Sequence, residues 1–402
     1  MYEIGEEEIE ALARLIRGKK LFRFGGTPEK PTETDHFERE LGAHMGAKHT
    51  LAVNSGTSAL ICALVGAGVE PGDEVLVPGY TFMATALAVL NIGAVPVLTE
   101  VDAGLMLDPL DVARKIGPRT KAIVPVHMMG HVADLEPILK IASERNAMVI
   151  EDACQCVGGS YRGKRTGTWG RAGAYSFNFY KILTCGEGGA MVTSDEKVWQ
   201  RARIQHDTGT AWRDDAPELK VPVFAGENYR FDEMRAAVMR VQLKRLEGIL
   251  SRLRARNHGL RERLGRPATF EFAPVHDLAG FAGTAMFLRL ENRAQAQAFA
   301  AEAAKRQLSA GLPYDSGRHV YSNWEPLIKR RGAFHPGRDP LATTEAGKAQ
   351  AYTVDALPRT LEHLSRTVSI GIGLDWTEQQ LDEAAEKIKL CGKHAASPVA
   401  AQ

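Results

Sequence analysis

The chain has 402 residues, 44% of them hydrophobic and 25% charged, and at about 100–200 residues per domain this length indicates two or three folded domains. Its 50 lysine and arginine residues exceed its 49 acidic residues by a net charge of only +1, which excludes a general nucleic-acid binder with a basic surface. Five cysteines are too few for a disulfide framework and indicate a reducing compartment.

The two sequence signals for export and membrane insertion are missing. Residues 1–20 are acidic first and basic later, the reverse of a signal peptide. The longest apolar stretch, residues 85–98, is interrupted by Asn91, Gly93 and Pro96, and it falls short of the ~20 apolar residues that a spanning helix needs. We therefore expect a cytoplasmic protein without a membrane partner.

Residues 1–250 alternate short apolar runs with helical patterns, after an N-terminal helical segment. Runs that are apolar throughout are typical of strands covered on both faces, and alternation with helices indicates crossover connections. We predict an α/β domain with a mostly parallel sheet flanked by helices. The expected strands are residues 50–53, 74–78, 95–98, 121–126, 147–151, 173–177 and 189–193, and the expected helices include 56–68, 81–91 and 134–146.

From residue 233 the pattern changes to one long amphipathic helix that is rich in arginine. A nucleic-acid-binding helix is one interpretation, but no aromatic residues interleave and the whole chain is neutral, which favours the solvated face of a connecting helix. A strand at 285–290 and helices at 295–311 and 377–391 follow. We predict a smaller α+β domain over residues 251–402.

Three segments of the large domain have the chemistry of a ligand site. Gly56, Thr57 and Ser58 stand where a strand gives way to a helix, which suits a phosphate, although an ordinary helix cap has the same pattern. Two acids end the strand near residue 151, where ligands bind in parallel sheets; a helix cap is again the alternative. Lys181 follows Ser176 in an aromatic, apolar segment that can lower a lysine pKa, whereas an isolated lysine is more often a surface residue.

Together these segments suit one ligand, pyridoxal 5′-phosphate (PLP). A phosphate anchor, a carboxylate for the protonated ring nitrogen, an aromatic ring at Phe82 and an amine at Lys181 match its parts. Asn228 and Arg230 add polar groups just before the long helix.

Nearly the whole chain resembles the DegT/DnrJ/EryC1/StrS family of fold-type I PLP aminotransferases, most strongly over residues 20–245. The resemblance implies that Lys181 is the Schiff-base lysine, that Asp152 holds the ring nitrogen and that Phe82 stacks on the ring. It also implies phosphate ligands at Thr57, Ser58 and Ser176, a ring neighbour at Gln155, and an Asn228 that reaches the phosphate of the other subunit in a homodimer with shared active sites. The segments that match are SGTSAL (55–60), PGYTF (78–82), EDACQ (151–155), YSFNFYKILTCGEGG (175–189) and NYR (228–230).

Most members of this family aminate a keto-sugar, usually nucleotide-linked, with glutamate or glutamine as the donor in a ping-pong reaction. Others aminate cyclitol ketones, make aminohydroxybenzoate, or aminate C8 of a 3-deoxy-octulosonate. The present chain is most similar to the last two branches, over residues 125–135, 151–170, 184–189 and 365–381. A subgroup that deoxygenates sugars has histidine in place of the lysine, so Lys181 argues against that reaction.

The sequence says less about which residues contact the substrate. Residues 311–327 correspond to a Tyr-Pro…His signature of the family and place His319 as a substrate contact. Arg230, Arg318 and Arg366 could hold a substrate carboxylate, or they could form ordinary ion pairs. Two other functions stay open: a PLP-dependent lyase, decarboxylase or cyclising enzyme, and a non-catalytic PLP-binding regulator. The intact Lys181 and Asp152 argue against the regulator.

Overall fold

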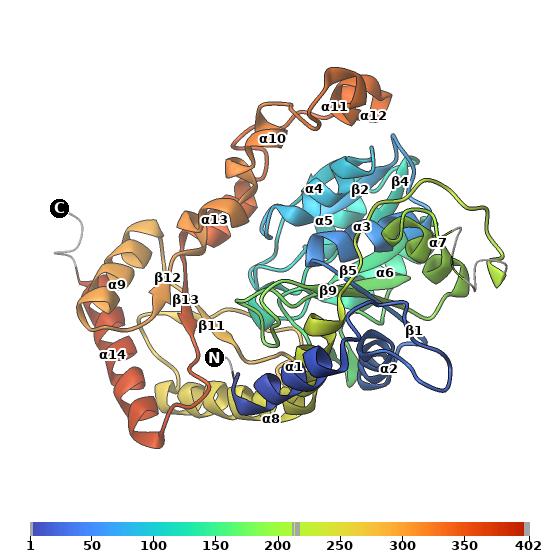
Figure 1. Cartoon of the computed structure of the whole chain (residues 1–402). Helices are drawn as coiled ribbons and strands as arrows, with labels where there is room; N and C mark the ends of the chain where they lie inside the picture. Colours follow the sequence, from blue (N-terminus) through green and yellow to red (C-terminus); the bar gives the residue numbers. More distant parts are fainter. Residues whose placement is uncertain (1–2, 211–212, 214–217, 398–402) are drawn as a thin grey trace.

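A computed structural model describes residues 3–210, 213 and 218–397 of the chain (Figure 1). Its centre is a seven-stranded sheet, and the seven strands predicted within residues 1–250 all belong to it. In order across the sheet the strands are β1 (His49–Val53), β9 (Gly189–Thr193), β8 (Ala172–Ser176), β5 (Met148–Asp152), β4 (Thr120–Ile123), β2 (Glu74–Pro78) and β3 (Val95–Thr99).

The sheet is mostly parallel, as the sequence predicts. Among the described strands, β9 alone runs antiparallel to its neighbours β1 and β8. Every residue of β2, β3, β8 and β9 is buried, which explains why these segments read as continuous apolar runs. This arrangement confirms the predicted fold class of a mixed α/β protein.

Helices flank the sheet. The largely apolar α3 packs on β1, β5, β8 and β9, while α5 packs on β3 and α6 on β5. The helices of this part are α1 (Glu6–Gly18), α2 (Glu33–Met45), α3 (Gly56–Ala67), α4 (Ala84–Asn91), α5 (Pro109–Lys115), α6 (Leu135–Glu144) and α7 (Glu196–His206), with a 3₁₀ turn, η1, at Met128–Gly130 and a hairpin of β6 (Ser160–Tyr161) and β7 (Lys164–Arg165).

The arginine-rich helix is α8 (Glu233–Leu264), one continuous helix that passes through the predicted domain boundary at residue 250. Several of its arginines pair with acidic side chains of neighbouring helices. Arg240 pairs with Glu33 and Glu40 of α2, and Arg263 pairs with Glu378 and Asp382 of α14 (Glu378–Ala396). The charge run therefore serves helix packing.

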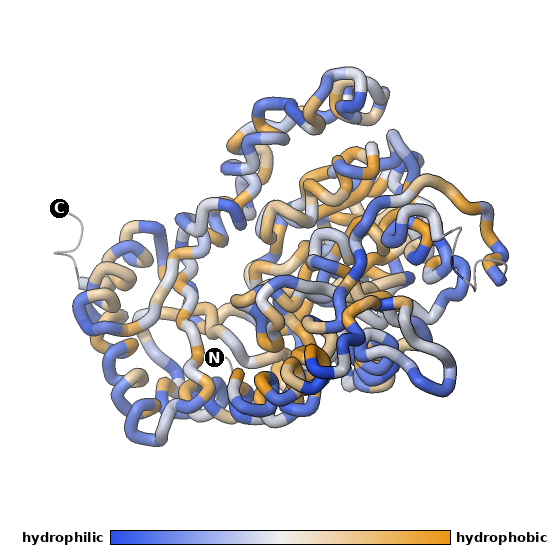
Figure 2. The backbone as a smooth tube through the Cα atoms, viewed as in Figure 1, coloured by the Kyte–Doolittle hydropathy of each residue, from blue (hydrophilic) through white to orange (hydrophobic). Residues whose placement is uncertain are grey.

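A second sheet follows α8. It is antiparallel, in the order β10 (Glu271–Phe272), β11 (Ala285–Arg289), β13 (Thr367–Gly371) and β12 (Ala310–Gly311), and α9 (Arg293–Lys305) and α14 pack together beside it. Figure 2 shows hydrophobic stretches gathered around the central sheet, whereas α9 and α14 carry long hydrophilic stretches. No helix in the described ranges has the length and apolar character to cross a bilayer.

Between β12 and β13 the chain leaves the small sheet and returns to the large one, as an arm over residues 312–366 (Figure 1). Tyr352 of the arm donates a hydrogen bond to the Pro96 carbonyl on edge strand β3 (2.6 Å), and Glu100 accepts from Thr360 (2.7 Å from the amide, 2.6 Å from the hydroxyl). The arm consists of η3 (Pro313–Asp315), η4 (Gly317–His319), η5 (Tyr321–Asn323), α10 (Glu325–Ile328), η6 (Pro336–Arg338), α11 (Pro340–Thr343), α12 (Glu345–Ala349) and α13 (Pro358–Ser365).

Candidate active site

The carboxyl ends of three parallel strands, β1, β8 and β5, lie at one edge of the large sheet, with the antiparallel β9 between β1 and β8. Asp152 is the last residue of β5 and Ser176 the last of β8, while β1 leads directly into the first turn of α3 at Gly56. This edge is where ligands bind in open parallel sheets. The structure therefore brings the predicted phosphate segment and the predicted carboxylate to the same place.

Asp152 is buried, with 4% of its surface exposed. Its Oδ2 accepts a hydrogen bond from the Thr85 hydroxyl (2.7 Å), and its Oδ1 accepts from the Cys154 amide (3.1 Å). Donors of this kind stabilise the ionised form of a carboxylate. The remaining acceptor capacity of the two oxygens is available to a ligand.

The adjacent acid, Glu151, has a structural role. Successive side chains of a strand point to opposite faces, so Glu151 turns away from Asp152 and is completely buried. Its carboxylate accepts from the amides of Gly167 (2.7 Å), Trp169 (2.6 Å) and Gly170 (2.8 Å). Glu151 thus holds the loop before β8.

Lys181 lies in the turn that follows β8 and is half-buried; its amide donates to the Asn178 carbonyl (2.9 Å). Its charge acts on the Cys154 thiol. Burial raises the pKa of that thiol well above the ordinary value, the negative charge of Asp152 raises it further, and the positive charge of Lys181 opposes both. The Cys154 amide is hydrogen-bonded directly to Asp152 (3.1 Å).

The first turn of α3 is pressed against the ends of β5 and β8. A Cβ atom on Gly56 would lie 2.8 Å from Ser176 Cβ and 3.0 Å from Cys154 Sγ, so only glycine fits there. Ser55 caps the helix by accepting from the Ser58 amide (3.1 Å). The backbone amides of Gly56 and Thr57, which precede Ser58 in the first turn, have no hydrogen-bond partner within their own helix and can bind an anion.

Two of the hydroxyl groups that are predicted to bind the phosphate already have hydrogen-bond partners in the protein. Ser58 Oγ donates to Asn54 Oδ1 (2.7 Å), and Ser176 Oγ accepts weakly from the Asn178 amide (3.4 Å). Ser58 can reach an anion through its hydroxyl only by giving up the bond to Asn54, whereas its neighbour Thr57 is half-exposed at the start of the helix.

Phe82 and His319 face each other across the junction between the large sheet and the arm. Their ring centroids are 5.7 Å apart, and Phe82 is 37% exposed. The Thr81 amide donates to the His319 carbonyl (2.9 Å) and the Met83 amide to the Arg318 carbonyl (3.2 Å). Burial lowers the pKa of His319, and the charges of Lys181 and Arg318 lower it further, so its imidazole is neutral at pH 7.

The predicted ring neighbour Gln155 lies close to this edge. It follows the Asp152 turn and is half-buried, and its Oε1 accepts a hydrogen bond from the Met129 amide (3.2 Å). Its role beside a ring stays a prediction.

Asn228 and Arg230 lie beside the end of β1, because Arg230 forms a bridge with Val53 and the Asn54 amide donates to the Tyr229 carbonyl (2.9 Å). Arg230 Nη1 pairs with the buried Asp207 (2.6 Å), which also holds Arg213 (2.6 Å). Asn228 is exposed, and its Oδ1 accepts from the Arg230 amide (3.3 Å). Another of the candidate arginines, Arg366, is bound at the end of α13, to Glu362 (3.0 Å) and the Leu290 carbonyl (2.8 Å). A substrate role for these arginines stays a prediction.

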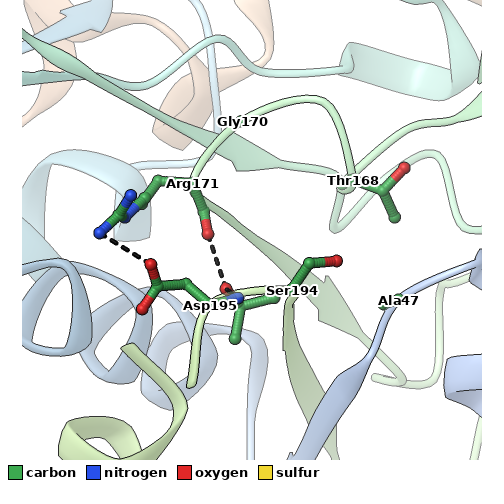
Figure 3. A pocket seen from close by; sticks show the side chains of 8 residues that line it. Ala47, Thr168, Gly170, Arg171, Ser194 and Asp195 are labelled. Atoms are coloured by element: carbon green, nitrogen blue, oxygen red, sulfur yellow. Dashed lines mark hydrogen bonds and ion pairs between the residues drawn. The ribbon is translucent and has the colours of Figure 1, made fainter. Parts of the chain in front are cut away.

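Two cavities lie away from the Asp152 edge. Figure 3 shows the first, of about 270 Å³, at the opposite end of β8, where Arg171 pairs with Asp195 (2.8 Å) and its carbonyl accepts from Thr193 (2.7 Å). The second, of about 350 Å³, lies between β3 and the arm and includes Lys115 and Tyr352. Neither cavity is lined by Asp152 or Lys181. We therefore place the candidate site at the Asp152 edge, where the predicted functional side chains lie.

The comparisons with known proteins identify the family. The DegT/DnrJ/EryC1/StrS aminotransferase family matches residues 2–336. The chain belongs to this family. A relative that spans most of the chain is the erythromycin biosynthesis sensory transduction protein EryC1 of Saccharopolyspora erythraea, 35% identical over 361 residues, 89% of this chain and 92% of the relative.

Two further matches illustrate the range of the family. GDP-perosamine synthase of Caulobacter vibrioides is 42% identical over 212 residues, 52% of this chain, and the match spans only 56% of that relative's length. The structure of a 3-amino-5-hydroxybenzoic acid synthase superposes with a TM-score of 0.80 at 31% identity, covering 97% of each chain.

The residues of the site fit the PLP that this family implies. They offer an amine at Lys181, a buried carboxylate at Asp152, an exposed ring face at Phe82, and amides beside Ser176 at a helix start that glycine keeps open. The carboxylate and the helix start are close together, since Cys154 contacts both: its amide donates to Asp152 and its sulfur lies against Gly56.

Three residues of this edge were missed by the sequence interpretation. Ser55 is the helix cap, and Thr81 and Thr85 form a hydrogen-bonded pair (2.9 Å) next to Asp152. A signal for the threonines existed: two polar residues four apart, hence on one face of an otherwise apolar helical segment, indicate a buried polar contact.

Proposed function

We propose that this chain is a PLP-dependent aminotransferase that moves an amino group from glutamate or glutamine to a keto- or aldehydo-sugar by a ping-pong reaction. The observation that carries the proposal is that Asp152 at the end of β5, the first turn of α3 and the end of β8, from which the Lys181 turn follows, meet at one edge of the large sheet, where Gly56 lies against Ser176 and Cys154. A lysine and an ionised carboxylate that share one ligand space at a sheet edge are what amino transfer on PLP needs.

Each residue has a role in this proposal. When bound, the cofactor supplies an aldehyde that accepts amino groups and a ring that withdraws electrons. Lys181 Nζ would hold the cofactor and would carry the proton that leaves the donor's α-carbon. Such acid–base catalysis contributes about 10²–10⁴-fold in rate. Asp152 would hold the proton on the ring nitrogen, and the first amides of α3 would hold the phosphate.

For the acceptor we propose a keto- or aldehydo-sugar, with a cyclitol ketone or an octulosonate-like sugar acid as the nearest variants. The likeness to a 3-amino-5-hydroxybenzoic acid synthase structure supports the branch resemblance seen in the sequence. The neutral imidazole of His319 beside Phe82 suits a hydrogen bond to a sugar hydroxyl, and the exposed Arg318 suits an anionic group.

The test uses the whole purified chain loaded with PLP. We expect L-glutamate or L-glutamine to convert the visible absorption band of the cofactor to the near-ultraviolet band of its amine form, with the oxo-acid released in equal amount. A panel of keto-sugars then restores the visible band. D-Glutamate is the control, because a site that positions one face of the donor does not accept it. A band that no amino donor changes would contradict the proposal.

Two other functions make different predictions in the same experiment. A lyase or cyclising enzyme would consume its substrate without accumulating the amine form of the cofactor. A regulator, the function that the name of the EryC1 relative suggests for that protein, would bind PLP without turnover. Because Lys181 and Asp152 are both present, aminotransfer is the function that we infer.

The five cysteines all have free thiols. Unpaired thiols are typical of a reducing compartment, and we infer a cytoplasmic location.

We further infer a homodimer in which Asn228 reaches the cofactor phosphate of the other subunit. Asn228 is exposed in the single chain, and so are the large apolar side chains Phe22 and Met234. The Phe22 ring centroid lies 5.8 Å from the guanidinium carbon of Arg213. Arg213 pairs with Asp207, and Asp207 forms a β-bridge with Asn228. An exposed apolar patch beside a polar residue of this kind suits a subunit interface.

Replacing Asn228 by alanine is expected to weaken PLP binding about tenfold, because one hydrogen bond to a charged phosphate is lost. The dissociation constant of apoprotein for PLP, measured by fluorescence quenching, checks this, with the exposed Asn91→Ala as the control. Mixed dimers of Asn228→Ala and Lys181→Ala subunits are expected to regain one site of normal affinity. Failure of mixing to restore any tight site would contradict the shared site.

A further inference from the structure

Behind Asp152 lies a short chain of hydroxyl groups. The Thr85 hydroxyl is 2.7 Å from Asp152 Oδ2 and 2.9 Å from the Thr81 hydroxyl. All three residues are buried, with exposed fractions of 4% for Asp152, 2% for Thr85 and 1% for Thr81. No solvent is therefore available to replace any of these contacts.

The direction of the hydrogen bonds follows from the number of protons. Asp152 as a carboxylate only accepts, so Thr85 donates its single proton to it. Thr85 then has only its lone pairs left for Thr81, so Thr81 donates to Thr85. The alternative, in which Thr85 donates to Thr81 or to the Phe82 carbonyl at 3.2 Å, would leave Oδ2 without this donor.

This chain of donors leads back to the arm. The Thr81 amide donates to the His319 carbonyl (2.9 Å) and the Tyr321 amide donates to the Gly79 carbonyl (2.9 Å). The backbone that carries Thr81 is thus held by the segment that presents His319 beside Phe82. The arm therefore helps to fix the position of Thr81, and through Thr81 that of Thr85.

We propose that Thr85, supported by Thr81, is a positioning residue that holds the Asp152 carboxylate ionised and oriented toward the ring nitrogen of the cofactor. This inference rests on the proposed cofactor role of Asp152. It assigns to the two threonines a function in the reaction and not only in packing. Because a donor to a buried carboxylate stabilises its charged form, loss of the Thr85 hydroxyl weakens the hold of Asp152 on a proton of the ring nitrogen.

The decisive comparison is Thr85→Val, which keeps the shape but loses the hydroxyl, against Thr85→Ser, which keeps the hydroxyl. We expect Thr85→Val to lower kcat for the donor half-reaction about 10- to 100-fold with KM nearly unchanged, the effect of one hydrogen bond to a charged group. The acid limb of its pH–rate profile moves to higher pH. Thr85→Ser restores kcat to within about threefold, and Thr81→Val has a smaller effect of the same sign.

A second readout does not depend on turnover: the pH titration of the visible absorption of the PLP-loaded protein, together with the affinity of the apoprotein for PLP. In Thr85→Val the titration moves to higher pH while the affinity changes less than about threefold. If Thr85→Val does not fold, Thr85→Ala and Thr81→Val are compared in the same way.

The outcomes separate this inference from the proposed function. Wild-type protein that forms no PLP band and transfers no amino group overturns both. Wild type and Asp152→Asn that behave as proposed, with a Thr85→Val variant whose kcat and pH profile equal those of wild type, overturn only the role of the threonines. Activity lost in proportion to lowered thermal stability, with no shift in the pH profile, likewise overturns it.

Discussion

Replacing Lys181 by alanine is expected to reduce turnover by about 10⁴-fold or more and to abolish the visible absorption band of the bound cofactor. The amine is the one group of the site that both attaches to the cofactor and carries the donor's proton. Lys181 is half-buried on a turn, and its ammonium group forms no ion pair or hydrogen bond with another residue that the structure describes, so we expect the fold to tolerate its loss. Absorbance and steady-state kinetics on purified protein measure both effects.

The control for Lys181→Ala is Lys244→Ala, an exposed lysine on α8 far along the chain from the sheet edge. It is expected to keep the band and the wild-type rate. Circular dichroism and thermal midpoints show whether both variants fold. A Lys181→Ala protein that is folded and turns over at the wild-type rate would refute the assignment of the lysine.

Replacing Asp152 by asparagine is expected to lower kcat about 10²–10³-fold, the loss typical when one preorganised electrostatic partner is removed. The amide has nearly the same shape and its oxygen can still accept from one of the two donors, Thr85 or the Cys154 amide, although its NH₂ group cannot accept from the other. What it lacks is the negative charge that holds a proton on the ring nitrogen. The cofactor therefore stays bound through Lys181 and the start of α3, but the donor half-reaction slows in stopped-flow measurements.

The adjacent Glu151→Gln supplies a matched contrast. Its carboxylate accepts three backbone amides, and a side-chain amide group cannot accept on its nitrogen, so we expect a loss of about 1.5–3 kcal/mol in unfolding free energy. The folded fraction is expected to retain the spectral response to the donor. If Asp152→Asn and Glu151→Gln had the same kinetic and stability effects, the separation of their roles would be wrong.

The strands of the large sheet could be predicted from residue patterns because each is apolar on both faces. Residues 74–78 and 189–193 were predicted with the bounds that β2 and β9 have in the structure. Their direction could not be predicted in the same way. A strand buried on both faces has the same pattern in either direction, so nothing local marked β9 as the antiparallel one.

The candidate site was open to prediction where one short segment carries the chemistry. Lys181 in its aromatic, glycine-rich turn and the acidic end of β5 were both visible in the sequence. The choice between Glu151 and Asp152 rested on the family resemblance, and its physical reason became visible only in the fold. One acid faces the loop at Gly167, and the other faces Thr85.

Local pattern and composition were therefore enough for the α/β class, for most of the helices and strands, and for the residue types that suit PLP, because these properties depend on neighbours within a few positions. They were not enough to predict which distant group a single side chain contacts. Thr85 is 67 positions from Asp152, and Arg230 is 23 positions from the Asp207 that binds it. Which carboxylate a distant hydroxyl or guanidinium meets depends on how elements pack, since a hydrogen bond or ion pair requires contact within about 3–4 Å that no spacing in the chain encodes.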